Sequence, residues 1–303
     1  MIKTNSFDEI LNKKIGFSKF QFFSLSLLSL AMLNNGVHLL FNSLLNPIIR
    51  KENSYSSFQI TLITSSFYFG TVIGSLLAGI ISDKFGRKYT FIYSSLFQFL
   101  ISVCFVACHT YNSNLILRFM AGVIFGINFP IINALSSEIT PTKYRGIVSI
   151  LVNFSLTIGK LYGCFLFYLY YENMEKGDWR SMMGHSSFTC LFAFILSFYF
   201  VEESPRFLCA TEKFEKSFEI LNLMGRKNNN NWVDIDIEEK KSLTNWQKEN
   251  FNKIPKKTNS FFTLLNPENR RVTLCLWFIW IAGNVLMYGQ MAVIFIFLII
   301  YPI

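Results

Sequence analysis

Charged side chains are scarce in this sequence, because Asp, Glu, Lys and Arg make up only 16% of its 303 residues. Ordinary soluble domains contain about 25% of these residues. Three patterns that mark enzymes are also missing, namely a Cys/His spacing typical of metal ligands, a nucleophile elbow and a glycine-rich phosphate loop. We therefore expect neither an enzymatic activity nor a metal or cofactor.

Hydrophobic residues instead dominate the chain, at 51%, and they gather in seven long blocks. A helix needs roughly 20 apolar residues to cross the hydrocarbon core of a bilayer. The blocks approach or exceed that length, and we predict an all-α, multi-pass integral membrane protein embedded in a lipid bilayer. The predicted spans lie near Phe20–Ile48, Phe58–Ile81, Tyr89–Cys108, Leu115–Leu135, Ile147–Tyr170, Ser186–Val201 and Val272–Ile300.

The spacing of the blocks predicts four segments. Residues 1–19 would form an N-terminal segment, and residues 20–201 would form a six-span bundle. Residues 202–271 are hydrophilic and would form a linker, either partly helical on the membrane surface or loosely ordered. Residues 272–303 would contain a seventh span. Within the linker we expect an amphipathic helix through Phe207, Phe214, Phe218 and Leu221 and a second helix from Trp232 to Phe251.

The net charge of +9 follows this topology. The loops expected outside hold only Arg50, Lys51, Lys176 and Arg180, and the inner segments hold most of the other basic residues. This bias agrees with the positive-inside rule when the N-terminus is inside. We therefore predict a cytoplasmic N-terminus and a cytoplasmic linker, and the charge implies no nucleic-acid partner.

Small residues recur every four positions in two of the blocks. Gly70, Gly74 and Ala78 lie in the second block, and Gly122 and Gly126 lie in the fourth. Such spacing allows helix backbones to approach closely in lipid, where packing drives helix association. The pattern predicts a tightly packed helix bundle.

The turn between the second and third blocks carries a distinctive run, GIISDKFGRK, at residues 79–88. A carboxylate at the C-terminal end of a helix opposes the helix dipole, so Asp83 requires a nearby cation. Arg87, four residues later, can supply it. Gly86 permits a sharp turn between two antiparallel spans.

This run resembles the signature loop of the major facilitator superfamily, G-x-x-x-D-[RK]-x-G-R-[RK]. The sequence EITPTKYRG at residues 138–146 is similar to the E-x-x-P-x-x-x-R-G of the same family. The sequence ESPRFL at residues 203–208 is similar to the P-E-S-P-R-[WF]-L of sugar porters and organic ion transporters, with Glu202 in place of the first proline. Arg118 and Gly122 match the opening of the fourth span.

Two further stretches resemble the branch of organic ion transporters and synaptic-vesicle proteins. They are GFSKFQ at residues 16–21 and LWFIW at residues 276–280. The loop expected after the first span is short and has no cysteine. Plasma-membrane organic cation carriers have a large, cysteine-rich loop there, so the short loop favours the synaptic-vesicle-like side.

The resemblance implies a fold of twelve spans in two halves that alternate access between the two sides of the membrane. This sequence supplies one half, the linker and one further span, and we therefore expect a truncated gene model or a fragment. The resemblance also implies a cytoplasmic latch that closes the inner side between conformations. The predicted latch residues are Gly79, Asp83, Gly86, Arg87, Lys88, Glu138, Arg145, Glu203 and Arg206.

Polar groups within the spans are candidates for a substrate or ion pathway, because burying them in a membrane is costly. Lys160, near the middle of the fifth span, can bind an anionic group or take part in ion coupling. Without such a role, it can pack among the helices or extend to the membrane interface. His38 can titrate near neutral pH, or it can hydrogen-bond to a neighbouring span. The candidates are Asn35, His38 and Asn42 in the first span, Asn153, Thr157 and Lys160 in the fifth, and Trp280, Asn284 and Tyr288 in the seventh.

Three functions remain in view at this point. The first is a secondary active or facilitative transporter of a small organic solute or ion, with a proton or another ion as a candidate for coupling. The second is a non-transporting vesicle-type membrane protein of the same fold. The third is a seven-span receptor, which the expected cytoplasmic N-terminus disfavours. The membrane would be the plasma membrane or that of an intracellular vesicle.

Overall fold

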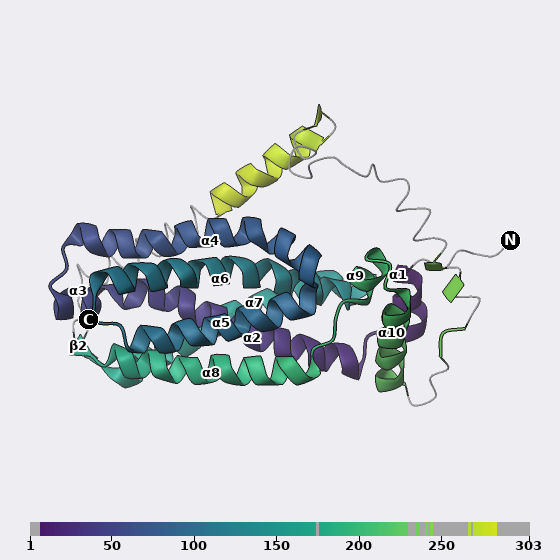
Figure 1. Ribbon diagram of the computed structural model, residues 1–303, viewed down its shortest axis with the longest axis horizontal. Helices are drawn as coiled ribbons and strands as arrows, with labels where there is room; N and C mark the ends of the chain where they lie inside the picture. The colour runs from purple at the N-terminus through teal and green to yellow at the C-terminus, as the bar shows by residue number, and fades with distance from the viewer. Residues whose placement is uncertain are drawn as a thin grey trace. The chain divides into compact units, whose positions relative to one another are not determined.

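A computed structural model describes residues 7–173, 176–229, 234–236, 240–241, 243–244, 266–267 and 269–283 of this chain (Figure 1). The chain divides into two compact units, Met1–Gln247 and Lys248–Ile303. In the first unit, long helices run alongside one another (Figure 1). In the second unit, residues 269–283 form a helix.

Among the described residues of the first unit, six helices are long and apolar enough to cross a membrane. This confirms the first six predicted spans and the all-α membrane fold. The helices are α2 Lys19–Leu44, α4 Ser57–Phe85, α5 Arg87–Val106, α6 Tyr111–Glu138, α7 Arg145–Tyr170 and α8 Trp179–Phe200. The helix at residues 269–283 overlaps the predicted seventh span, Val272–Ile300, whose remaining residues, 284–300, fall outside the described part of the chain.

The ends of two spans differ from the predictions. The first apolar block divides into α2 and a short helix α3, Asn46–Asn53. Helix α8 begins at Trp179, seven residues before the predicted start at Ser186, because the Asp178 side chain accepts a hydrogen bond from the backbone N–H of Ser181 and caps the helix. A two-stranded ribbon, β1 Tyr171–Asn173 and β2 Lys176–Gly177, precedes this cap.

Serine residues define the starts of the first two spans. Ser18 and Gln21 form a capping box at α2, and Ser56 and Gln59 form another at α4. In each pair, the glutamine side chain accepts a hydrogen bond from the backbone N–H of the serine. These bonds satisfy donors that the first turn of a helix leaves without intrahelical partners.

Glycines set the closest approaches between the spans. A β-carbon at Gly74 of α4 would lie 2.1 Å from the carbonyl oxygen of Val123 in α6. A β-carbon at Gly159 of α7 would lie 1.9 Å from the carbonyl oxygen of Leu33 in α2. Both distances are far below van der Waals contact, so these helix pairs pack backbone against backbone. The tight packing predicted from the glycine spacing of α4 and α6 is therefore present.

Short elements gather at one end of the bundle (Figure 1). Apolar side chains from all of them except η2 join the main core cluster together with those of the spans, including Leu11, Phe218, Leu221 and Met224. The elements are α1 Phe7–Ile10, the π-helix η1 Leu11–Ile15, the 3-10 helix η2 Thr142–Tyr144, α9 Pro205–Ala210 and α10 Phe214–Asn228.

The first linker helix predicted from the sequence thus appears as two helices, α9 and α10. Residues 211–213 separate them, and Glu212 has a φ of 61° in this break. The second predicted linker helix, Trp232–Phe251, lies mostly outside the described residues.

Candidate functional site

The Glu203 carboxylate lies at the N-terminus of α5. Its Oε1 accepts hydrogen bonds from the backbone N–H groups of Arg87 at 2.9 Å, Lys88 at 3.0 Å and Ser204 at 2.9 Å. A helix N-terminus attracts an anion through its free N–H groups and its dipole. Glu203 is only 8% exposed, and this burial raises the pKa of its carboxyl group against the opposing effect of these hydrogen bonds.

Arg87 connects three elements around this carboxylate. Its guanidinium donates to Asp83 Oδ1 at 2.9 Å, and its Nε lies 3.5 Å from Glu138 Oε1 at the end of α6. The same guanidinium lies 4.6 Å from the ring centre of Phe207 in α9. The structure therefore brings together the acidic residues of all three sequence motifs around the α4–α5 turn.

Lys88 extends this cluster to Glu202. Its Nζ lies 3.4 Å from Glu202 Oε2, and both side chains are partly buried. Glu202 is the residue that replaces the first proline of the family pattern, so the departure from the pattern supplies an ion-pair partner here. Gly79 lies on an exposed face of α4 and takes no part in the cluster.

Gly86 forms the turn beneath the Glu203 carboxylate, and the last two predicted latch residues, Arg145 and Arg206, form a separate group. Arg145 donates to Asp8 Oδ1 at 2.6 Å, and Arg206 donates to Asp8 Oδ2 at 3.0 Å. Asp8 lies in α1 and was not among the residues predicted from the sequence. The apolar residues at positions 7, 10 and 11 have helical spacing, which could have indicated an amphipathic helix there.

His38 lies inside the six-helix bundle. Its Nε2 is 3.2 Å from Ser102 Oγ in α5 and 3.4 Å from Cys190 Sγ in α8. The side chain is buried, at 6% exposure. These contacts are those expected for a histidine hydrogen-bonded to neighbouring spans, which was one of the two roles considered for it.

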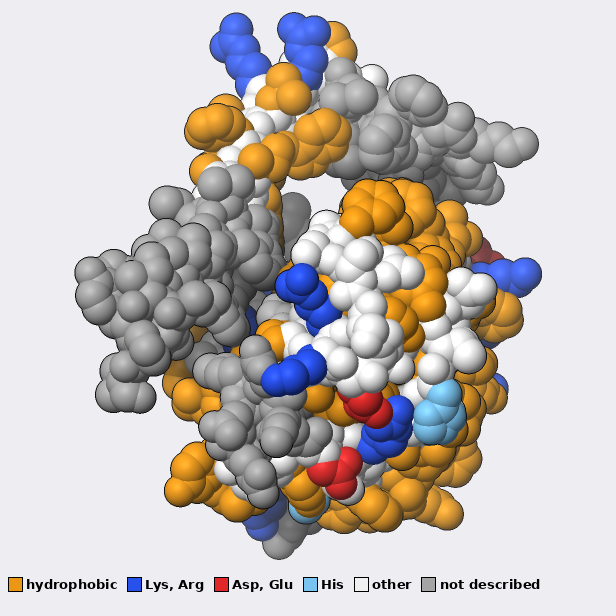
Figure 2. Space-filling view, turned by 90° about the vertical axis from the view of Figure 1, so that its left-hand side faces the viewer, with side chains coloured by type: hydrophobic (Ala, Val, Ile, Leu, Met, Phe, Trp, Pro, Cys, Tyr) orange, Lys and Arg blue, Asp and Glu red, His pale blue; other side chains and the backbone are white. Residues whose placement is uncertain are grey.

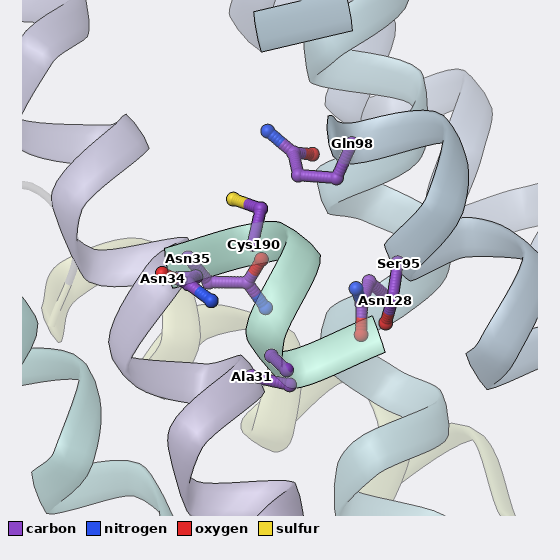
Figure 3. A pocket seen from close by; sticks show the side chains of 8 residues that line it. Ala31, Asn34, Asn35, Ser95, Gln98, Asn128 and Cys190 are labelled. Atoms are coloured by element: carbon purple, nitrogen blue, oxygen red, sulfur yellow. The ribbon is translucent and has the colours of Figure 1, made fainter. Parts of the chain in front are cut away.

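Asn35 borders a small polar cavity between α2, α5, α6 and α8 (Figure 3). Three buried polar atoms of the residues that line this cavity have no hydrogen-bond partner among the described residues. They are Asn35 Nδ2, Gln98 Oε1 and Asn128 Oδ1. Asn34, on the same wall, exchanges two hydrogen bonds with Thr189. Gln98 and Asn128 were not predicted from the sequence, although buried amides in spans are a signal that could have found them.

Arg118 and Gly122 lie on α6, which crosses the middle of the bundle. The Arg118 guanidinium is buried 4.6 Å from the ring centre of Phe105, and one of its nitrogens donates to the carbonyl oxygen of Phe41 at 3.4 Å. A β-carbon at Gly122 would lie 2.0 Å from the carbonyl oxygen of Phe67. Arg118 therefore joins α6 to the C-terminal part of α2, and Gly122 is required by the packing of α6 on α4.

The polar residues of α7 are less enclosed than those of α2. Asn153 donates to Asn133 Oδ1 at 2.8 Å, and Thr157 is exposed. Lys160 is half-buried and, within the described part of the chain, has no hydrogen bond or ion pair. Asn42 of α2 is fully buried, and neither atom of its amide has a partner among the described residues.

The candidates in the predicted seventh span belong to the second unit. Trp280 lies in the helix at residues 269–283, with its side chain exposed. Asn284 and Tyr288 lie outside the described residues.

A further charged cluster lies at the opposite end of the bundle, where Figure 2 shows acidic, basic and histidine side chains close together. Glu52 of α3 accepts hydrogen bonds from Trp179 Nε1 and from the Arg180 guanidinium, which also lies 3.4 Å from His109 Nδ1. Burial alone would raise the pKa of the Glu52 carboxyl, but the bonds from Arg180 and Trp179 outweigh it and lower the pKa. This cluster was not predicted from the sequence.

Comparisons with known proteins agree with this architecture. A family model described as "Sugar (and other) transporter" matches residues 25–297. Organic cation/carnitine transporter 7 of Arabidopsis thaliana is 26% identical over 300 residues, which cover 91% of this chain and 59% of that protein. Synaptic vesicle 2-related protein of Bos taurus is 28% identical over 276 residues, which cover 91% of this chain and 47% of that protein.

A solved structure shares the fold. The partially occluded, inward-open conformation of the xylose transporter XylE from E. coli matches with a TM-score of 0.64 at 19% identity, over 77% of this chain and 60% of that one. The chain spans about half the length of the two relatives named above. Because the family model matches most of the residues, this chain belongs to the sugar (and other) transporter family, which has the membrane-spanning helical fold of the major facilitator superfamily.

Proposed function

We propose that the six-helix unit is one half of a transporter that moves a small organic solute or ion across a membrane by alternating access. The observation that carries this proposal is the Glu203–Arg87 cluster at the α4–α5 turn. It joins the ends of α4, α5 and α6 to the segment after α8. These contacts hold the ends of four spans together, so that the half-bundle can move as one body.

The charges of this cluster are proposed to control conformation. Exposed ion pairs contribute only about 0–1 kcal/mol to stability. A contribution to stability therefore does not explain why charged residues of three motifs meet at one turn. Glu203 is different because it is buried and accepts three backbone N–H bonds. Such a group is costly to remove from its partners, and its release would accompany a large rearrangement at this end of the bundle.

Lys160 is the proposed contact for an anionic substrate group. It is a half-buried cation on a span, and no described residue forms an ion pair with it. An ammonium group in the membrane interior is stabilised by a nearby anion. Asn153 and Thr157 lie on the same face of α7 and would supply polar contacts beside it.

Asn35 and His38 are proposed to position α2 within the half-bundle. Both side chains are buried, and the His38 imidazole is already engaged with α5 and α8. Asn35 and His38 carry no carboxylate, so an organic cation would find no fixed negative charge at these two positions. Proton coupling through His38 would require its contacts with Ser102 and Cys190 to rearrange.

The N-terminus and the motif-bearing end are proposed to face the cytoplasm, in the plasma membrane or an intracellular vesicle membrane, following the distribution of Lys and Arg. The alternative of a vesicle-type protein that does not transport has support in the similarity to synaptic vesicle 2-related protein. A seven-span receptor leaves the three clustered motifs unexplained.

Uptake into proteoliposomes tests the proposal. The full-length gene product would be reconstituted and offered a panel of radiolabelled sugars, organic anions and organic cations. We expect saturable uptake of at least one class, and abolition of that uptake by a charge reversal at Arg87. A stably folded, reconstituted product that accumulates no member of the panel would favour the non-transporting alternative.

A further inference from the structure

The N-terminal segment α1–η1, residues 7–15, lies at the motif-bearing end of the bundle, close to α9 and α10 (Figure 1). Four of its side chains, Phe7, Ile10, Leu11 and Ile15, are buried to 5% exposure or less and belong to the main core cluster. Apolar burial is the main driving force for such docking in water. The segment is therefore an integral part of the fold at this end.

Asp8 is placed by this docking between two arginines from distant parts of the chain. Each of its carboxylate oxygens takes one guanidinium, Oδ1 that of Arg145 at 2.6 Å and Oδ2 that of Arg206 at 3.0 Å. Arg145 begins α7, and Arg206 lies in the first turn of α9. One carboxylate thus joins the starts of two helices that lie on opposite sides of α8 in the sequence.

Polar contacts on the C-terminal side of Asp8 keep α1 and η1 in register. Asn12 donates to Thr142 Oγ1 at 2.7 Å and accepts from the Thr142 backbone N–H at 2.8 Å. Asn228 at the end of α10 donates to the Ile15 carbonyl oxygen at 3.1 Å. The segment is therefore fastened to η2 and α10 as well as to the two arginines.

We propose that Asp8 is a positioning residue and that α1 with η1 forms an N-terminal clamp on the cytoplasmic end of the half-bundle. The clamp holds Arg145 and Arg206, two of the residues assigned by family resemblance to the latch. Any acidic group that recruits these arginines during alternating access must compete with Asp8. The inference that this competition affects the conformational equilibrium rests on the proposed function, whereas the clamp itself does not.

Hydrogen exchange on the purified full chain, in detergent or in nanodiscs, tests the clamp without any transport measurement. Asp8→Asn keeps the shape of the side chain and removes its charge. Because hydrogen bonds between charged groups are the stronger kind, we expect amide exchange across residues 9–15 to accelerate about tenfold. Amides of α4 and α6 should exchange as in the parent protein.

Three further variants make the result decisive. Lys13→Gln removes a charge from the same segment, where Lys13 is exposed and pairs with Glu9, and it should leave exchange unchanged. Leu11→Ala should accelerate exchange through lost apolar burial, which verifies that the measurement detects release. In a double-mutant cycle, Asp8→Asn should accelerate amide exchange across residues 9–15 less in the Arg206→Gln background than in the parent protein.

Parental exchange rates in Asp8→Asn, together with faster exchange in Leu11→Ala, would overturn the proposal. The two proposals also fail separately. A product without transport activity can still release its clamp in Asp8→Asn, and a transporting product can keep the segment docked in the same variant.

Discussion

The carboxylate of Glu203 occupies the space in which a side chain at residue 86 would begin. A β-carbon built on Gly86 would lie 2.1 Å from Glu203 Oε2, and Gly86 has a φ of +97°, which favours glycine. The short glycine turn therefore lets the carboxylate reach the first amides of α5. The conformation of the Gly86 turn and the binding of the Glu203 carboxylate to the first N–H groups of α5 therefore depend on each other.

Gly86→Ala should destabilise the bundle by about 1–3 kcal/mol, because the backbone conformation becomes strained and the carboxylate must move. Thermal unfolding in detergent, followed by a thiol-reactive dye, measures the change. Gly79→Ala in the same sequence motif is the matched control, since nothing lies within 4 Å of a β-carbon there. Equal melting temperatures for the two variants would contradict this account of the turn.

Glu203→Gln should change how stability depends on pH. Burial raises the pKa of Glu203 in the folded protein, so the folded state binds this proton more readily than the unfolded state. The contribution is fully present below the unfolded pKa of about 4.3 and is lost as pH rises through the folded pKa. Parent minus variant stability should therefore increase from pH 7 to pH 4.5, as measured by thermal melts. A constant difference would contradict the prediction.

Glu52→Gln should have the opposite dependence. Hydrogen bonds from Arg180 and Trp179 lower the pKa of Glu52 in the fold. Its contribution is therefore present above the ordinary carboxyl pKa of about 4.3 and is lost as pH falls through the lowered value. Thermal melts from pH 6 down to pH 3 should show the parent losing its advantage over the variant. An advantage that grows on acidification would exclude this ion-pair arrangement.

Lys160→Ala in the full-length product should reduce uptake of anionic substrates at least tenfold, because their charge would lose its partner in the membrane. Uptake of neutral or cationic compounds should be unaffected. Lys160→Arg keeps the charge and serves as the control. Its anion uptake should be closer to that of the parent than the uptake of Lys160→Ala is. Unchanged anion uptake in Lys160→Ala would remove this residue from the pathway.

Gly159→Ala should weaken the packing of α2 against α7 by about 1–3 kcal/mol, since the added carbon would overlap the Leu33 carbonyl oxygen. Gly184→Ala in α8 is the control, because its β-carbon would meet nothing within 4 Å. Resistance to unfolding in increasing SDS provides the comparison. Similar unfolding of both variants would argue against the close approach of these helices.

The sequence allowed much of the fold to be predicted because the signals are local. Each span appears as a continuous run of apolar residues, because the hydrocarbon core of a bilayer excludes polar side chains. Ser56 and Gln59 carry a capping pattern within four residues, and Gly74 lies in a spacing typical of close helix contacts. The start of α8 was missed because polar residues lie between the cap at Asp178 and the apolar block. These residues form the first turns of the helix.

The candidate site could be predicted only in part. The grouping of Asp83 with Arg87 is readable, because the two residues are one helical turn apart. The assignment of Arg145 and Arg206 to Asp8 joins residues more than a hundred positions apart in the chain, and no local pattern encodes such a partner. The roles proposed for Lys160 and for the latch residues stay predictions until the experiments above are done.

By itself, the sequence determined that this protein crosses a membrane repeatedly and carries charged motifs at the turns on one side. Both properties depend on residues that are near one another in the chain. Only the tertiary structure decided which charges meet. It placed Glu203 at the start of α5, Asp8 between two arginines, and Asn35 against a small polar cavity. Those outcomes depend on how helices distant in sequence pack together, since hydrogen bonds and ion pairs act over a few ångströms in space.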